Sequence, residues 1–207
     1  IECAMAYALN ELYGAGLERM ELVKMAQKAE HEYAGVLCGI MDQFASMMGR
    51  AGHAMRLDCA TLGFDYVPLR LEGYRFLLLN TNVKHSLASS EYNTRRQECE
   101  RGVALVKKQY PDVQSLRDVS LAMLEESVAQ EDALAYKRCR YVVEENIRLQ
   151  EACHDLHAGN LPALGQKMLA THRGLSEDYA VSCPELDWLV EYVKGKPGVL
   201  GARMMGG

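Results

Sequence analysis

The sequence predicts an α+β fold, for three reasons. Apolar residues recur every three or four positions before residue 49 and after residue 88, which is the helical period. Three short runs between residues 54 and 79 are typical of β-strands. Helices and strands do not alternate strictly along the chain, which favours an α+β arrangement over a doubly wound sheet. We expect a domain boundary near the third strand, giving domains of residues 1–77 and 78–207.

The composition excludes several classes of protein. The chain has 207 residues, enough for one large domain or two small ones. Its net charge of -5 argues against nucleic acid as the main partner, because phosphate binding needs a basic face. No apolar run approaches the roughly 18–20 residues that span a bilayer, so we expect no membrane segment. The cysteines are scattered and form no CxxC pair, which favours a reduced, cytoplasmic location over a disulfide framework or a zinc site.

Three helices are predicted at the start of the chain. Residues 1–12 follow the helical spacing, and Gly14 ends that helix. A second helix has its apolar face on residues 22–33 and stops at Gly35. A short helix over residues 42–48 follows, because a glycine closes it on each side.

Three strands come next, over residues 54–58, 64–69 and 74–79. Glycine-containing turns separate them. The third reads Tyr-Arg-Phe-Leu-Leu-Leu and is almost wholly apolar. We therefore expect it to be buried on both faces of a sheet.

The second half of the chain is predicted to be mostly helical. Two long helices are expected over residues 91–109 and 133–156. Asn160 is the predicted N-cap of the next helix, whose second position is a proline. Ser182–Glu185 has the spacing of a capping box that opens a last helix. Residues 197–203 are expected to form a turn into a strand.

Asp42 is the first candidate for chemistry, because it follows a glycine break at the point where a helix begins. A carboxylate in the first turn lies at the positive end of the helix dipole, which stabilises its ionised form. Such a carboxylate could accept a proton from a hydroxyl group, or orient that hydroxyl for attack on a phosphoryl group. The alternative is that Asp42 is simply an N-cap, a role that aspartate often takes.

Glu30 and Tyr92 are further candidates with open alternatives. Magnesium is usually held by one or two carboxylates plus phosphates, and Glu30 could supply such a ligand. Helical periodicity equally allows Glu30 to be a solvated surface residue. Tyr92 closes a hydroxyl-rich run, and its ring and hydroxyl suit a ligand with polar edges and apolar patches. The alternative is a core tyrosine at a helix start.

Two adjacent arginines, Arg95 and Arg96, could form an anion site. Glutamates lie nearby at positions 91, 98 and 100. Pairing between residues three or four apart on a helix surface explains this pattern more simply. We therefore predict surface ion pairs at this position.

Two segments of the chain resemble the galactokinases, a family of the GHMP small-molecule kinase superfamily. The first is Cys38–Phe44, which reads CGIMDQF, and the second is His85–Tyr92, which reads HSLASSEY. Galactokinases share both blocks, and the resemblance covers essentially all 207 residues. It implies a two-lobed α+β fold of the GHMP-kinase type, with a ferredoxin-like C-terminal lobe and an active site between the lobes.

The resemblance also implies a role for each candidate residue. Asp42 corresponds to the catalytic base, and the backbone of Gly39 and the side chain of Tyr92 to sugar contacts. Glu30 corresponds to the ligand that holds Mg²⁺ between the phosphates of ATP. The implied activity is phosphorylation of α-D-galactose at its C1 hydroxyl, with galactose and MgATP as the partners and neither nucleic acid nor membrane involved. The implied protein is cytoplasmic and a monomer or weak dimer.

Parts of the family pattern are expected outside these residues. In the superfamily a glycine-serine loop wraps the ATP phosphates, and the resemblance places that loop upstream of Ile1. Residues 201–207 resemble the start of a C-terminal glycine-rich motif. We therefore expect the 207 residues alone to be inactive. Two rivals stay open: an N-acetylgalactosamine kinase, which depends on room near the sugar's C2, and a non-catalytic regulator that senses galactose and ATP.

Overall fold

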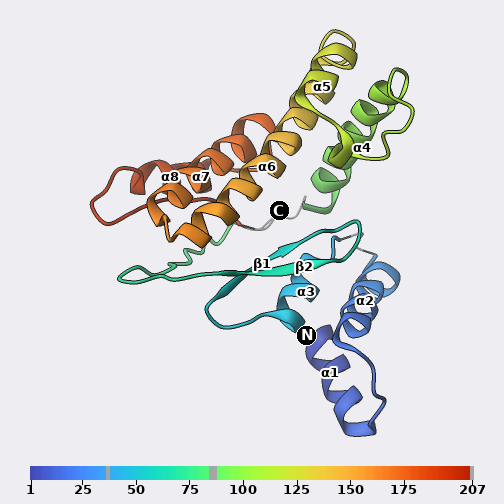
Figure 1. The fold of residues 1–207 in the computed structure, drawn as a ribbon, viewed down its shortest axis with the longest axis vertical. Helices are drawn as coiled ribbons and strands as arrows, with labels where there is room; N and C mark the ends of the chain where they lie inside the picture. Colours follow the sequence, from blue (N-terminus) through green and yellow to red (C-terminus); the bar gives the residue numbers. More distant parts are fainter. Residues whose placement is uncertain (36–37, 84–87, 206–207) are drawn as a thin grey trace. The chain divides into compact units, whose positions relative to one another are not determined.

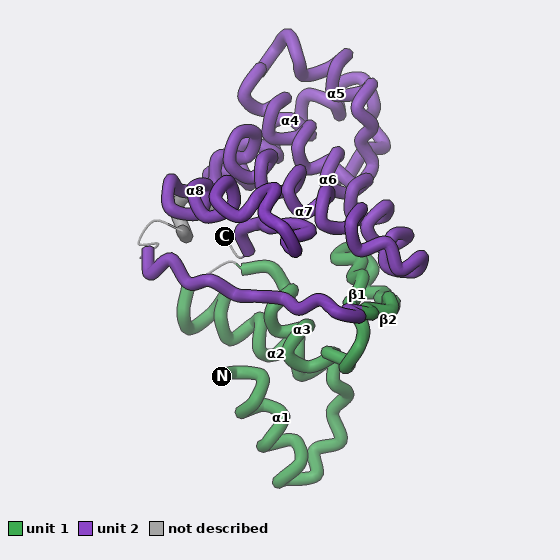
Figure 2. The backbone as a smooth tube through the Cα atoms, turned by 90° about the vertical axis from the view of Figure 1, so that its left-hand side faces the viewer, with its two compact units in different colours: residues 1–70 green, residues 71–207 purple. Residues whose placement is uncertain are grey.

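The structure is a computed structural model that describes residues 1–35, 38–83 and 88–205, without the side chains of residues 88–92. The chain divides into two compact units, Ile1–Arg70 and Leu71–Gly207 (Figure 2). The predicted lobe boundary after residue 77 stays a prediction.

Unit 1 consists of helices followed by a β-hairpin (Figure 1). Gly14 and Gly35 end two of the predicted helices in the left-handed conformation, with φ of 60° and 69°, which glycine adopts without strain. The hairpin is antiparallel, with Met55 opposite Tyr66. Its two strands and the first three helices are confirmed, and the last turn of the second helix is π-helical. The elements are α1 (Glu2–Tyr13), α2 (Arg19–Ala29), the π-helix η1 (Glu30–Ala34), α3 (Met41–Met48), β1 (His53–Leu57) and β2 (Phe64–Pro68).

The core of unit 1 holds α3 in place. Val23, Ile40 and Phe44 are buried together, and the rings of Phe44 and Phe64 meet edge to face with their centroids 5.1 Å apart. These contacts join α2, the start of α3 and the hairpin. The position of the α3 N-terminus is therefore set by apolar packing on the inner side of the helix.

The prediction of a third strand over residues 74–79 is wrong. Tyr74–Leu79 forms neither helix nor strand, and Leu77 and Leu78 are 80% and 74% exposed. A strand exists only where a neighbour accepts its backbone hydrogen bonds. Within the described ranges, β1 and β2 pair with each other and with no further strand. An apolar composition alone could not supply the missing neighbour.

Unit 2 is built around one long helix. This helix, α6 (Ala133–Ala158), packs against α4, α5 and α7 (Figure 1). Asn160 caps α7 as predicted, since its side-chain oxygen accepts a hydrogen bond from the Ala163 amide at 3.2 Å. The other elements are α4 (Ala88–Lys107), the 3-10 helix η2 (Leu116–Asp118), α5 (Leu121–Ser127), α7 (Leu161–Arg173), the π-helix η3 (Gly174–Asp178) and α8 (Pro184–Val193).

The main core of unit 2 lies between α4, α5 and α6. Val106, Leu124 and Cys139 are fully buried there. Gly102 of α4 faces Cys139, and a methyl group at Gly102 would lie 2.3 Å from the Cys139 sulfur. The close approach of α4 and α6 thus depends on a residue without a side chain at this position.

Two predictions in the C-terminal part are wrong in detail. Ser182 does not cap α8: the N-cap is Cys183, and no side chain makes a capping bond there. The Ser182 hydroxyl donates instead to Asp187, at 2.6 Å. Residues 199–203 form no strand, because no described segment lies beside them as a hydrogen-bonded partner. A search of the described helices finds none with the length and apolar character that a bilayer span requires.

Candidate active site

Asp42 lies in the first turn of α3, where the sequence predicted it. The N-cap of α3 is Ile40, so the alternative of Asp42 as an N-cap is wrong. Its carboxylate is exposed, and the backbone oxygen of the same residue accepts a hydrogen bond from Ser46 at 2.8 Å. The exposed side chain of Asp42, at the start of a helix, is accessible to a substrate.

Gly39 lies in the loop that leads into α3. The loop is fastened by the Cys38 carbonyl oxygen, which accepts a hydrogen bond from Gln27 at 3.2 Å and lies 2.9 Å from Nε2 of His31. Gly39 itself is exposed, and among the described residues no atom beyond its two chain neighbours lies within 4 Å of where a Cβ would be. The backbone of Gly39 is therefore open to a ligand while its neighbour is held in place.

Gln43 provides a second attachment for the same loop. It is buried, its amide nitrogen donates to the Cys38 sulfur at 3.7 Å, and its backbone oxygen accepts from the Cys3 thiol at 3.7 Å. Among the described residues, no donor reaches its side-chain oxygen. These bonds tie α1, the loop and α3 together around the Gly39 backbone.

Glu30 begins the π-helix η1 and is half-buried. Together with Glu2 it lines a hollow of about 390 Å³ in the surface of unit 1. Single π-helical turns are frequent at functional sites, because the extra residue re-aims the side chains around it. The helix that carries Glu30 also carries His31, which contacts the Cys38 carbonyl oxygen. Glu30, Gly39 and Asp42 thus belong to one connected part of unit 1.

Tyr92 lies in α4 of unit 2, but its side chain falls outside the described part of the structure, as do the side chains of residues 88–91 and the whole of residues 85–87. The sugar contact assigned to Tyr92 stays a prediction. Gln27 and His31 lie outside the two family blocks, and Gln43 lies inside the first block but was given no role of its own. The roles of all three were not predicted, because each side chain contacts the carbonyl oxygen or the sulfur of Cys38, and these contacts form only in the folded chain.

The prediction of surface pairing holds for one arginine and is wrong for the other. Arg96 pairs with Glu100 at 2.9 Å, and both side chains are exposed. Arg95 is buried and pairs with the buried Glu98, which also accepts a hydrogen bond from Arg138 of α6 at 3.1 Å. Packing of α6 on α4 covers one face of the helix, and sequence spacing does not reveal which face.

Comparison with known proteins was made over the whole chain. Residues 1–50 match the GHMP kinases N terminal domain family. Galactokinase of Thermotoga maritima is 44% identical over all 207 residues, and the human galactokinase is 46% identical over 184 residues, 89% of this chain. The chain spans about half the length of these relatives, 57% and 46% respectively.

A solved structure extends the likeness to the fold. The crystal structure of Lactococcus lactis galactokinase complexed with galactose superposes with a TM-score of 0.90 at 39% identity, covering 99% of this chain and 53% of that one. This match confirms the predicted α+β fold class. Over its whole length the chain is thus similar to the galactokinases, and its first 50 residues match the N-terminal domain of the GHMP kinases.

Proposed function

We propose that the full-length protein transfers the γ-phosphoryl group of MgATP to the C1 hydroxyl of α-D-galactose. The observation that carries the proposal is the 44% identity with a galactokinase over all 207 residues, including both sequence blocks. We place the reaction in the cytoplasm, because all seven cysteines are free.

In this proposal Asp42 is the base or the orienting carboxylate. The C1 hydroxyl donates its hydrogen to the exposed Asp42 carboxylate, and the hydroxyl oxygen attacks the γ-phosphorus while the bond from that phosphorus to the bridging oxygen breaks and ADP leaves. The Gly39 backbone and the Tyr92 side chain are the residues that we assign to sugar binding. Catalysis by such residues is mainly positioning and charge stabilisation of a loose phosphoryl transition state.

The residues present fit a magnesium ion. Mg²⁺ prefers oxygen ligands such as carboxylates. The side chains of Glu30 and Glu2, which are both carboxylates, line the same hollow. Glu30 would hold the ion. When bound, the ion neutralises charge on the transferring phosphates. One or two protein carboxylates suffice, because phosphate and water oxygens complete the shell.

The first experiment is ADP release by the full-length protein with galactose, N-acetylgalactosamine, glucose and mevalonate as acceptors. We expect selective turnover of galactose. Selective turnover of N-acetylgalactosamine would show that this sugar is the substrate and that the same phosphoryl transfer takes place.

Binding without turnover would overturn the enzymatic proposal. Isothermal titration of galactose in the presence of a non-hydrolysable ATP analogue distinguishes this outcome from a protein that does not recognise the sugar. Galactose binding with no ADP release would identify a sensor. Indifference to galactose in both assays would contradict the proposed substrate.

A further inference from the structure

The segment from Leu200 to Met205 is fastened along α7. Gly165 of α7 and Gly201 approach so closely that a methyl group on Gly165 would lie 2.1 Å from the Leu200 carbonyl oxygen. The same addition at Gly201 would lie 2.3 Å from the Gly165 carbonyl oxygen. Met204 is buried at the other end of this contact. The helix and the segment therefore meet backbone to backbone at one point.

His172 provides the second point of attachment. It is only 5% exposed, and its Nδ1 accepts a hydrogen bond from the Met204 backbone amide at 3.2 Å. Its other ring nitrogen, Nε2, lies 3.2 Å from Oδ1 of Asp187 in α8. One imidazole thus links the segment, α7 and α8.

These contacts define the protonation state of the ring. A backbone amide can only donate, so Nδ1 must carry a free lone pair to accept from Met204. The single hydrogen of the neutral ring is then on Nε2, where it is donated to Asp187. A second proton on Nδ1 would place two N–H groups against each other, and the bond to Met204 would be lost.

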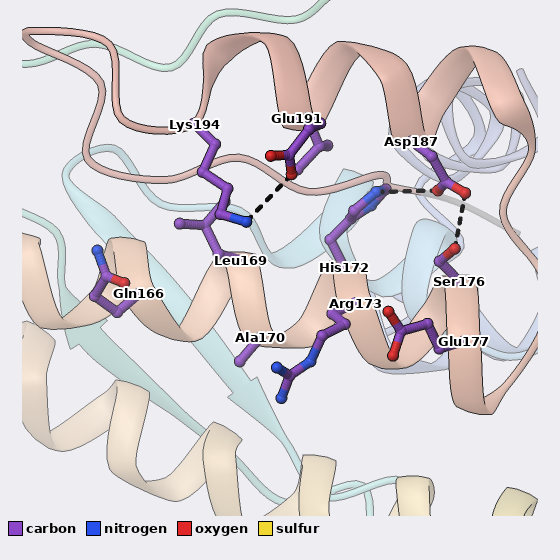
Figure 3. Close-up of a pocket in the computed structure, with 11 residues that line it drawn as sticks. Gln166, Leu169, Ala170, His172, Arg173, Ser176, Glu177, Asp187, Glu191 and Lys194 are labelled. Atoms are coloured by element: carbon purple, nitrogen blue, oxygen red, sulfur yellow. Dashed lines mark hydrogen bonds and ion pairs between the residues drawn. The ribbon is translucent and has the colours of Figure 1, made fainter.

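Asp187 is held by two further donors. The Ser176 hydroxyl donates to its Oδ2 at 2.8 Å, and the Ser182 hydroxyl donates to its Oδ1 at 2.6 Å. Figure 3 shows His172 and Ser176 on either side of this carboxylate, beside a pocket of about 450 Å³. Both hydroxyls are directed at Asp187 and not at the imidazole. The group is therefore no serine–histidine nucleophile pair but a support for the ring.

We propose that His172 is a positioning residue that fastens residues 200–205 to α7 only while its ring is neutral, so that acidification releases this segment. The link to activity rests on the proposed function, because this segment opens the glycine-rich stretch that resembles the family's C-terminal motif. The fastening itself rests only on the contacts above.

The charges around the ring act in opposite directions. Burial lowers the pKa of His172, the Asp187 carboxylate raises it, and the Arg203 guanidinium lowers it, with a net shift below the ordinary value of 6.5. Across the pocket lie Lys194 of α8, which pairs with Glu191 at 3.2 Å, and two charged side chains at the end of α7 and in η3, Arg173 and Glu177. From α6, Glu145 accepts from the neighbouring Thr171 at 2.6 Å.

The sign of the pH dependence follows from that shift. Between the lowered pKa of the folded state and 6.5, the unfolded chain binds more protons at this residue than the folded chain. The contribution of neutral His172 to the stability of the folded state is therefore complete above pH 6.5, and it falls as the pH drops below 6.5. At neutral pH the segment is fastened.

The test is amide hydrogen exchange of the 199–205 peptide in the full-length protein, corrected for the intrinsic pH dependence of exchange. Three proteins are compared: wild type, His172→Asn and His172→Gln. Asn places an oxygen acceptor where Nδ1 lies, whereas Gln places its amide nitrogen where Nε2 lies and removes the acceptor for Met204. His157→Asn is the matched control, because His157 is exposed and its Nδ1 lies 2.8 Å from the Cys153 carbonyl oxygen of its own helix.

We expect wild-type protection of the peptide to fall by up to about ten-fold per pH unit between pH 6.5 and the folded-state pKa of His172, and to level off below it. His172→Asn should stay protected across that range, and His172→Gln should be unprotected even at pH 7.5. His157→Asn should behave as wild type. Protection that does not change with pH in wild type, or equal loss in the Asn and Gln variants, would overturn the proposal.

A kinetic arm uses the same proteins. The ratio of turnover at pH 5.5 to turnover at pH 7.5 should be higher for His172→Asn than for wild type. If exchange follows the expected pattern while no variant turns over galactose, the proposed function fails and the positioning role stands. If turnover is normal but hydrogen exchange is the same whether or not residue 172 provides an acceptor for the Met204 amide, only the positioning role is contradicted.

Discussion

Glu98 receives hydrogen bonds from two arginines in a part of unit 2 that excludes water. Burial opposes its ionisation, yet the bonds from Arg95 and Arg138 outweigh this, and the pKa of Glu98 lies below its ordinary value of 4.5. Arg138 also donates to the Asp178 backbone oxygen, so the cluster ties α4 and α6 to η3. Removing one member of such a cluster takes a charged partner away from groups that stay buried.

Glu98→Gln should therefore lower the free energy of unfolding by about 3 kcal/mol, because two buried arginines lose their counter-charge. Urea denaturation at pH 7 measures the change. Glu100→Gln is the control: it removes an exposed pair on the same helix and should cost less than about 0.5 kcal/mol. The folded-state pKa of Glu98 is lowered, so its contribution is present above pH 4.5 and is lost as the pH falls. A deficit that stays constant down to pH 3 would contradict this assignment.

Asp42 is the single residue on which we expect catalysis to depend. In the full-length protein, Asp42→Asn should reduce turnover at least about a hundred-fold, since the amide cannot accept the hydroxyl proton. Stability should change little, because the Asp42 side chain is exposed and caps nothing. Steady-state ADP release and a thermal melt measure the two effects. Asp112→Asn replaces another exposed carboxylate and should leave both unchanged. Normal turnover by the Asp42 variant would remove this residue from the mechanism.

The entry into α3 shows how elements place a reactive group. Apolar packing of Phe44 fixes the inner side of the helix, and hydrogen bonds from Gln27 and His31 fix the loop before it. Asp42 is carried on the opposite, exposed side. A short helix anchored at both its core face and its entry loop keeps a carboxylate in one place without burying it.

At α7, the close backbone approach gives a direct test. Gly165→Ala should destabilise the protein by about 2 kcal/mol, because the methyl group meets backbone atoms that cannot rotate away. This loss exceeds the gain of roughly 1 kcal/mol that alanine brings to a helix interior. Gln166→Ala, on the exposed side of the same helix, should stay within about 0.5 kcal/mol of wild type. Equal melting temperatures for wild type and Gly165→Ala would show that the backbone at Leu200 and Gly201 does not lie against α7 in solution.

Over the whole molecule, the chain divides into two compact units with an irregular, apolar stretch at the start of the second. Residues 74–79 expose Phe76, Leu77 and Leu78. Such a stretch has neither buried side chains nor ladder hydrogen bonds to protect it from proteolysis.

Chymotrypsin should cut the 207-residue chain first within residues 74–79 and leave two products. Phe44 and Tyr141 are 2% and 6% exposed, and the bonds beside them should survive until much later. Mass spectrometry of early time points measures the order of cleavage. Early cuts beside Phe44 or Tyr141 would show that the units are not compact in solution.

The sequence by itself determined most of the helices, though not α5, and the location of Asp42. Caps, left-handed glycines and the 3.6-residue period act between neighbours in the chain, so Gly14, Gly35 and Asn160 could be interpreted directly. The same holds for the hairpin, whose strands are adjacent. The two family blocks identified the class of protein because they depend on residue order alone.

The tertiary structure alone decided which groups meet. Nothing in the spacing separates the buried Arg95 from the exposed Arg96, because the distinction arises from the packing of α6 on α4. Residues 74–79 have the composition of a buried strand but no described partner. His172 and Met204 are thirty-two positions apart, and only folding brings an amide to the imidazole. Local interactions are encoded between neighbours, whereas burial and pairing depend on surfaces from distant parts of the chain.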